Sequence, residues 1–491
     1  MESRKAHSPL QQRQAGILLH PTSLPGPWHC GDLGVEAYHF VDFLVAAGQR
    51  VWQILPLSPT HDDLSPYQSL SAHAGNPELI SIETIAAHGW LDGEVVPSNT
   101  PHAKGALIRR AWQGFCVRAD DAARAELQLF LENQRHWLDD YALFCVIKQV
   151  KKGRGWSEWP APLRDRKANA LQAIRDDHAD DLAVICFEQF LFYRQWHALK
   201  QYANSKGILL FGDMPIFVSQ DSADVWAQRN CFDLDENGQP LVVAGVPPDY
   251  FSATGQRWGN PHYDWEWMES DGFSWWRQRM EGQLELFDLV RIDHFRGFEA
   301  YWEIPAHEET AINGRWVKAP GDALFASLQK NFDPLPVVAE DLGTITPEVN
   351  ALRKKYALPG MKILQFAFDG SPTNPYLPHN HGRNCVVYTG THDNDTTLGW
   401  FISLDEKARG VVMEYLGQPA EAMPWPLVRA AYASVARLAM VPLQDVLALD
   451  GDHRMNTPGT TSGNWQWRFS WDMVPQDLAA RLRRMTELYR R

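Results

Sequence analysis

The sequence predicts a closed (β/α)8 barrel, in which eight parallel strands alternate with helices. Three observations support this: recurrent short apolar runs, helical patterns between them, and polar residues that follow the runs at one end. Continuous runs rich in Val, Ile and Leu are typical of parallel strands buried on both faces. The predicted strands are Ile17–His20, Val51–Leu55, Ile208–Asp213, Leu289–Asp293, Val337–Glu340, Met361–Phe366, Cys385–Thr389 and Ala439–Pro442.

Helical patterns lie between many of these runs. Residues 34–47 are an example, with apolar side chains at Val35, Phe40, Val41 and Leu44. Strands that alternate with helices indicate a parallel sheet, either closed as a barrel or open and doubly wound.

Polar residues favour the barrel over the open sheet. His20, Asp213, Asp293, Glu340 and the cluster 391–395 all stand at or just beyond the C-terminal ends of predicted strands. Barrel enzymes carry their chemistry on that face, where the loops after the strands converge.

The spacing of the runs divides the chain into segments. Residues 1–57 hold the first two strands, with residues 1–14 expected to lack order, and 58–206 form a mostly helical insertion. The barrel continues over 207–472, with a Gly/Pro-rich loop over its mouth at 230–261. Residues 473–491 are expected to form a C-terminal helix packed on the barrel.

Composition excludes several classes of protein. The chain has 491 residues, 45% of them hydrophobic, and a net charge of −14, which disfavours nucleic acid and acidic membrane surfaces as partners. No apolar run reaches the roughly 18 residues of a membrane span. Six scattered cysteines without a CxxC pair favour free thiols in the cytoplasm over disulfides or zinc.

Three strand ends carry carboxylates that could act together. Arg291 and Asp293 share one face of a strand, and a guanidinium beside a carboxylate favours its ionised form. Glu340-Asp341 follows three apolar residues, where burial raises a carboxyl pKa toward that of a general acid. The run 388–395 supplies Asp393 and Asp395. These patterns leave open which member of each of the last two pairs faces the site.

These stretches resemble the short motifs of the alpha-amylase clan, in order Gly212–Pro215, Arg291–His294, Ala339–Asp341 and Thr391–Asp393. The longer stretches 291–302, 339–349 and 388–400 are similar to those of the 4-alpha-glucanotransferases called amylomaltase or disproportionating enzyme. So are 65–77, 245–261 and 358–370, and the resemblance spans about Gly16 to Trp467.

The resemblance implies Asp293 as nucleophile, Glu340 as acid/base and Asp393 as stabiliser of the transition state. It thereby selects Glu340 over Asp341 and Asp393 over Asp395. The positions that it implies for glucan binding are Tyr67, Asp213, Tyr250, Phe251, Gln256, Trp258, Arg291, His294, Asp369, His392 and Asn464.

The resemblance also implies a retaining transfer of alpha-1,4-glucan segments between maltooligosaccharides, in glycogen, starch or maltose metabolism. That chemistry needs no cofactor, and no metal site is expected. A hydrolase of the same clan and a non-catalytic glucan-binding protein are the alternatives, and the oligomeric state is left open. One stretch departs from the family pattern, since His61-Asp62-Asp63 replaces a Gly-rich turn on the acceptor side.

Overall fold

The computed structural model describes residues 10–248 and 252–491 and contains the expected eight-stranded parallel sheet. The sheet has the order β10-β11-β12-β1-β2-β3-β6-β9. Its strands are β1 (Gln14–Leu18), β2 (Val51–Gln53), β3 (Leu209–Met214), β6 (Leu289–Ile292), β9 (Val337–Ala339), β10 (Gly360–Ile363), β11 (Cys385–Tyr388) and β12 (Leu438–Pro442).

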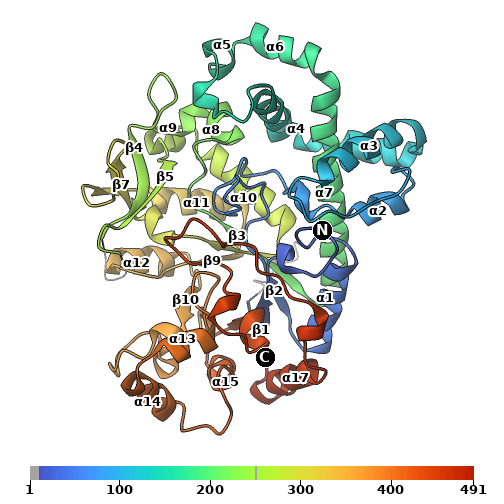
Figure 1. The fold of residues 1–491 in the computed structure, drawn as a ribbon. Helices are drawn as coiled ribbons and strands as arrows, with labels where there is room; N and C mark the ends of the chain where they lie inside the picture. The colour runs from blue at the N-terminus through green and yellow to red at the C-terminus, as the bar shows by residue number, and fades with distance from the viewer. Residues whose placement is uncertain (1–9, 249–251) are drawn as a thin grey trace, which may run out of the picture.

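The sheet closes into a barrel between β10 and β9, the strands at the two ends of this order. Ala339 N, at the end of β9, donates to Pro359 O beside the start of β10, at 2.8 Å. The (β/α)8 prediction is therefore confirmed, and each predicted strand is present (Figure 1). Most strand ends differ from the predicted ones by one to three residues, and Leu364–Phe366 forms a 3-10 turn instead of extending β10.

Side chains alternate between the inside and the outside of the barrel. Phe211, Leu289 and Val338 belong to the cluster that fills the interior, together with Tyr388 of β11 and Met440 of β12. Their strand neighbours pack outward against the helices in a separate, larger cluster. Alternation along each strand therefore fixes which residues reach the mouth beyond the strand ends.

Helices surround the barrel and form the insertion. After the strands come α1 (Val35–Ala46), α8 (Ala223–Ala227), α9 (Trp265–Ser270), α10 (Ser274–Leu286), α11 (Gly321–Asn331), α12 (Pro347–Lys355), α13 (Thr397–Ser403), α14 (Glu406–Tyr415), α15 (Trp425–Ala433), α16 (Leu443–Val446) and α17 (Leu478–Tyr489). The insertion contributes α2 (Ile82–Ala87), α3 (Lys104–Arg118), α4 (Asp121–Val150), α5 (Ala161–Arg164), α6 (Ala168–Asp177) and α7 (Ala179–Ser205).

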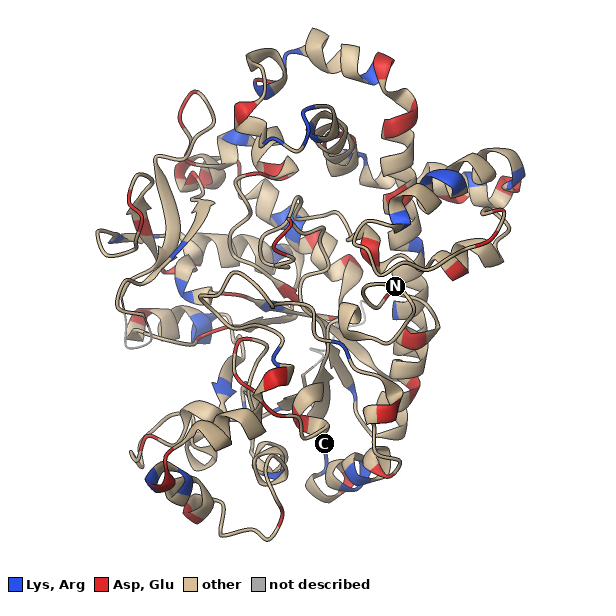
Figure 2. Ribbon diagram, in the orientation of Figure 1, with Lys and Arg blue, Asp and Glu red and all other residues tan. Residues whose placement is uncertain are grey.

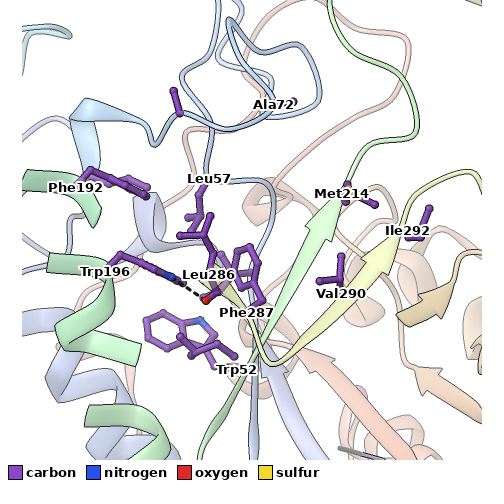
Figure 3. Packing of buried hydrophobic residues seen from close by; sticks show 14 of the residues in the cluster. Trp52, Leu57, Ala72, Phe192, Trp196, Met214, Leu286, Phe287, Val290 and Ile292 are labelled. Atoms are coloured by element: carbon purple, nitrogen blue, oxygen red, sulfur yellow. Dashed lines mark hydrogen bonds between the residues drawn. The ribbon is translucent and has the colours of Figure 1, made fainter. Parts of the chain in front are cut away.

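The long helix α7 joins the insertion to the barrel wall (Figure 1). Trp196 of α7 donates its indole N–H to Leu286 O of α10 at 2.9 Å, beside Trp52 of β2, whose side chain packs outward from the barrel (Figure 3). The side chain of Gln189 binds Gly75 both ways, accepting from its N–H at 2.8 Å and donating to its carbonyl at 3.0 Å. The Trp196 contact thus anchors the insertion to the wall, and the Gln189 contacts tie two segments of the insertion to each other.

The segment 230–261 differs from the expected loop. It contains two antiparallel strands, β4 (Val242–Val246) and β5 (Gln256–Pro261), in a four-stranded sheet of order β5-β4-β7-β8. The sequence did not predict β7 (Ala300–Pro305) or β8 (Arg315–Lys318). The Gly and Pro residues of this segment indicated a loop. At Gly245, however, the absence of a side chain allows two strands to approach closely, because a Cβ there would lie 2.1 Å from Gln256 O.

The two ends of the described chain meet at the bottom of the barrel. The predicted C-terminal helix is α17, which packs on α1 and α15. In contrast to the expectation for residues 1–14, Leu10 is buried and Arg13 donates to the carbonyls of Tyr432, Ser434 and Tyr489. Residues 1–9 lie outside the described part of the chain.

Charged residues of both signs are interspersed on the outer helices (Figure 2). Among the helices of 10–248 and 252–491, none has the length and apolar character that crossing a bilayer requires.

Candidate active site

Arg291 connects two carboxylates at the barrel mouth. It lies on β6 opposite Asp213 of β3, and its Nη1 donates to both Asp213 oxygens at 2.7 and 2.6 Å. Its Nη2 donates to Asp293 Oδ1 at 2.7 Å. The Asp213 and Arg291 side chains are buried, whereas that of Asp293 is 28% exposed. Asp293 is therefore the member of this trio that solvent or a ligand can reach.

Glu340 lies beside Asp293 at the end of the neighbouring strand. Its two carboxyl oxygens accept from His294 N at 2.7 Å and Leu342 N at 2.8 Å. Burial and the nearby Asp293 charge raise the pKa of Glu340 to about 7, against the opposing effect of Arg291 and the two backbone donors. At neutral pH this carboxyl is thus poised between its acid and its base form.

Asp341 faces the other way. Its Oδ1 accepts from Met361 N at 2.7 Å, and its Oδ2 lies 3.1 Å from Arg353 Nε. These contacts hold Asp341 between strand β10 and helix α12, so that it ties the barrel wall together and does not point into the mouth.

Asp393 lies on the loop after β11 and remains about half exposed, at 47%. Its carboxylate is 3.2 Å from His392 Nε2 and accepts from Asn456 Nδ2 at 2.7 Å. Partial burial disfavours its charge, but His392 and Asn456 outweigh that cost and hold the pKa of Asp393 well below its ordinary value. Asp393 is therefore an ionised group facing solvent.

Aromatic rings link these groups around one opening. Tyr67 donates its hydroxyl to Asp213 Oδ2 at 2.9 Å, and its ring stacks on His392 with centroids 5.2 Å apart. On the other side, Trp258 meets His294 edge-on at 5.0 Å. Burial lowers the pKa of His294 to about 4, so its imidazole is neutral. Its buried Nε2 has no hydrogen-bond partner among the described residues.

The other predicted binding residues have different positions. Gln256 accepts from the Trp258 indole at 3.1 Å and is exposed. Asp369 is also exposed and accepts from Ser371 N, with no contact to the three carboxylates. Asn464 holds its own loop closed by accepting from Thr457 N at 2.9 Å. Tyr250 and Phe251 lie outside the described residues.

Known proteins resemble this chain along nearly its whole length. The model of the 4-alpha-glucanotransferase family matches residues 19–474. Curated 4-alpha-glucanotransferases of Thermus thermophilus and Synechocystis sp. are 52% and 49% identical, covering 97% and 98% of this chain and 98% and 99% of their own. The solved amylomaltase of Streptococcus agalactiae, in complex with acarbose, superposes with a TM-score of 0.94 at 38% identity, over 98% of this chain and all of its own.

The chain belongs to the 4-alpha-glucanotransferase family. Its enzymatic activity is 4-alpha-glucanotransfer, as the sequence resemblance implied.

The glucanotransferase site contains residues that the sequence analysis did not select. The Trp465 ring lies 5.9 Å from both Tyr67 and His392, on a loop that the chain reaches only after the last barrel strand. From the same loop region, Asn456 binds the Asp393 carboxylate and Arg454 donates to its backbone carbonyl at 2.9 Å. No local pattern marks these residues, because they act on a segment about 60 residues earlier in the chain.

Asp445, in α16, is a further missed residue of the glucanotransferase. It is fully buried and accepts three hydrogen bonds of 2.6 Å, from Thr389 Oγ1, Thr397 N and Thr397 Oγ1. The two threonines flank the loop that carries His392 and Asp393. Asp445 therefore fixes both ends of that loop without reaching the opening.

The unusual turn at His61-Asp62-Asp63 lies on the insertion side of the glucanotransferase. His61 Nε2 is 3.1 Å from Ser219 Oγ, and burial, the largest effect, lowers the pKa of His61. Thr60 pairs with Ser69 in an isolated antiparallel bridge, which closes the loop that carries Tyr67. The turn thus packs on the segment after β3.

Replacing Arg291 by lysine tests whether one planar guanidinium holds the site. A single ammonium cannot span Asp213 and Asp293 with the same donor geometry, so we expect Arg291→Lys to lower kcat/KM for glucan transfer by about 100-fold or more. The matched control is Arg315→Lys, at a largely exposed arginine that pairs with Glu303, and it should keep near-normal activity. Equal activity of both variants would contradict the central role of Arg291.

Proposed function

We propose that Asp293 is the nucleophile of this 4-alpha-glucanotransferase, Glu340 its general acid and base, and Asp393 the carboxylate that stabilises the transition state. The observation that carries the proposal is the pairing of Asp293, bound to the guanidinium of Arg291, with a buried Glu340 whose pKa is raised to about 7. Retaining glycosidases need such a pair, one carboxylate ionised and one protonated, about 5–5.5 Å apart.

In the first step, Asp293 attacks the anomeric carbon of the donor glucan as Glu340 protonates the departing 4-oxygen. The glycosidic bond breaks, and a covalent glucosyl-enzyme ester forms on Asp293. His294 N and Leu342 N hold the Glu340 carboxyl in place through this transfer. General acid–base catalysis of this kind contributes about 10²–10⁴-fold to the rate.

In the second step, Glu340 acts as a base. Once Asp293 is esterified, it no longer carries the negative charge that helps to raise the Glu340 pKa, while Arg291 continues to lower it. The Glu340 pKa therefore falls, and the carboxylate takes a proton from the acceptor 4-hydroxyl, which attacks the anomeric carbon and releases Asp293. The configuration at that carbon is retained.

Asp393 and His392 are proposed to bind hydroxyl groups of the reacting glucose. Positive charge develops on the sugar ring in the oxocarbenium-like transition state, and an ionised carboxylate nearby stabilises it. Burial opposes a charged imidazole at His392, but Asp393 outweighs it and raises the pKa of His392. This pair can therefore offer the sugar both a donor and an acceptor.

Donors and acceptors are proposed to be maltooligosaccharides and longer alpha-1,4-glucans. Tyr67, Trp258 and Trp465 lie around the opening and offer flat faces on which the apolar sides of glucose rings can stack. Since all six cysteines are free thiols, we also propose that the enzyme works in a reducing cytoplasm, in glycogen, starch or maltose metabolism.

Transfer, as opposed to hydrolysis, requires an acceptor hydroxyl to compete with water. We propose that the sheet containing β4 and β5 restricts water at the mouth through Trp258. Gln68 Nε2 donates to Trp258 O at 3.4 Å and to Asn260 Oδ1 at 3.2 Å, which joins β5 to the loop of Tyr67. Through these two hydrogen bonds, Gln68 joins the segments that carry the rings on the two sides of the opening.

Incubation with maltotriose tests the proposed reaction. Disproportionation should give glucose and a ladder of longer chains with little gain in reducing ends. We expect Asp293→Asn to lower kcat by about 10⁴-fold or more, because the amide cannot form the glucosyl ester. The control Asp452→Asn changes an exposed carboxylate and should keep the wild-type product pattern. Full turnover by a folded Asp293→Asn protein would remove the nucleophile assignment.

The pH profile tests the role of Glu340. The first step needs its protonated form, and its pKa is raised to about 7. We expect kcat/KM to level off about one pH unit below that value and to fall about tenfold per pH unit well above it. Initial transfer rates at low substrate concentration, measured between pH 5 and pH 9 (roughly two units either side of that pKa), would follow this limb. A flat profile up to pH 9 would contradict Glu340 as the acid.

Replacement of Trp258 tests water exclusion. We expect Trp258→Ala to raise the ratio of reducing ends formed to glucosyl units transferred by several-fold, because water then reaches the glucosyl ester more often. Trp316→Ala is the control, since Trp316 lies on β8 of the same sheet and is 39% exposed. An unchanged ratio in the Trp258 variant, with transfer slowed, would show that this ring only binds glucan.

A further inference from the structure

His29, Cys30 and Glu78 bring three metal-ligating side chains together outside the active site. One ligand atom from each, a His29 ring nitrogen, Cys30 Sγ and a Glu78 carboxylate oxygen, lies within 4.8 Å of the others. In the described part of the chain, this is the one group of three or more His, Cys, Asp or Glu residues found to meet that closely. Cys30 is buried, and the His29 and Glu78 side chains are only 17% and 13% exposed.

The ligand atoms are close to the spacing of a tetrahedral site. His29 Nδ1 lies 3.5 Å from Glu78 Oε2. Zinc bonds of about 2.0–2.3 Å place neighbouring ligand atoms about 3.3–3.8 Å apart, so that pair already has the required separation. Glu78 Oε2 is buried and accepts no hydrogen bond from the described residues, which leaves an acceptor without the partner that burial normally demands.

The backbone that carries these residues is fixed on both sides. His29 and Cys30 precede α1, and Glu78 lies in the 3-10 turn Pro77–Leu79. Leu33 N donates to Leu79 O at 2.8 Å, which joins the two segments beside the cluster. Asn76 Oδ1 accepts from Glu78 N at 3.0 Å and fixes the start of the turn. Small rotations of the side chains would therefore close the site without moving the chain.

Two cations lie near the cluster, and both are already paired. Lys104 Nζ donates to Asp32 Oδ2 at 3.0 Å and to the carbonyls of Glu78 and Ile80 at 2.8 Å. Arg468 donates to the carbonyls of Leu24, Gly26 and Trp28. Asp32 compensates the charge of Lys104. A divalent cation bound by the Cys30 thiolate and the Glu78 carboxylate would carry no net charge, so the cluster would stay neutral when occupied.

We propose that His29, Cys30 and Glu78 bind one divalent transition-metal ion, with zinc as the best match. Mixed nitrogen, sulfur and oxygen ligands favour a borderline-soft ion over Mg²⁺ or Ca²⁺, and water completes the tetrahedron. The exposed His102, whose Nδ1 is 3.4 Å from Glu78 Oε1, orients the Glu78 carboxylate from the other side. The ion cross-links the loop after β1 to the start of the helical insertion and takes no part in glucan transfer.

Binding involves the loss of one proton. Burial raises the pKa of the Cys30 thiol to about 12, so the metal-free thiol is protonated at neutral pH. The metal–sulfur bond forms as the thiol proton passes to the buffer, while His29 binds as a neutral imidazole.

The sequence did not predict this site. His29 and Cys30 are adjacent, but Glu78 follows Cys30 by 48 residues, so no spacing motif marks the set. The expectation that no metal binds rested on a reaction that needs no cofactor and on the absence of a CxxC pair, and neither concerns ligands that are distant in sequence and lie outside the active site.

Cobalt titration of the full-length, tag-free protein tests the proposal directly. Co²⁺ bound by a thiolate in a tetrahedral site gives a near-ultraviolet charge-transfer band and intense visible bands. We expect both bands to saturate at one Co²⁺ per chain, to disappear on addition of Zn²⁺, and to be lost in Cys30→Ser. The matched control Cys116→Ser changes an exposed cysteine and should keep both bands.

Thermal unfolding provides a second readout. Zn²⁺ at about 100 times its Kd should raise the Tm of the wild type and of Cys116→Ser by about 2–3 °C, and that of Cys30→Ser by less than half as much. Transfer activity should stay within about twofold in both variants, because Cys30 lies outside the catalytic machinery.

Two results would overturn the proposal. One is the absence of a thiolate–cobalt band in the wild type. The other is a band or a Zn²⁺-dependent Tm shift that Cys30→Ser retains. Neither result bears on the roles of Asp293 and Glu340, so failure of the metal site is distinguishable from failure of the catalytic assignment.

Discussion

The charge balance at the barrel mouth depends on Arg291. One buried guanidinium binds both oxygens of Asp213 and one oxygen of Asp293, and it also lowers the pKa of the neighbouring Glu340. Without that cation, three carboxyl groups would share a water-poor space, and at least one would become protonated. A fixed positive charge allows Asp293 and the titratable Glu340 to stand side by side.

The barrel makes this arrangement possible through alternation along its strands. Asp213, Asp293 and Glu340 have the same parity as Phe211, Leu289 and Val338, which fill the interior. They therefore continue the inward-facing rows beyond the hydrophobic core. Asp341 has the opposite parity and turns toward α12, where Arg353 meets it. A one-residue shift in β9 would turn Asp341 toward the mouth and Glu340 toward α12. The core side chains that fix the register of β9 therefore also decide which carboxylate reaches the mouth.

Groups around the opening are fixed by partners far away in the chain. Asp445 holds both threonines that flank the Asp393 loop, Asn456 binds its carboxylate, and Trp465 packs against Tyr67 and His392. The glucan site is thus assembled from the first quarter, the middle and the end of the chain. The helical insertion contributes less to the chemistry than to support, through the anchoring of α7 on the barrel wall.

By itself, the sequence determined the strands of the barrel, the closed barrel that they form and the family. Each of these rests on local patterns. Apolar runs indicate the eight barrel strands, and contiguous motifs around Asp293, Glu340 and Asp393 indicate the family. Alternation also separates Glu340 from Asp341, but only after Val338 is known to face inward, which the sequence does not state.

Only the tertiary structure decided what depends on contacts between distant segments. β4 and β5 lie in a segment whose Gly and Pro residues indicate a loop, and they become strands because they pair with each other and, through β4, with β7. The partners of Asp393 and the meeting of His29 and Cys30 with Glu78 follow the same rule. Local periodicity indicates on which face of a strand or helix a residue lies. The ionisation of a side chain and its ability to bind a ligand depend instead on groups that the folded chain brings within a few ångströms.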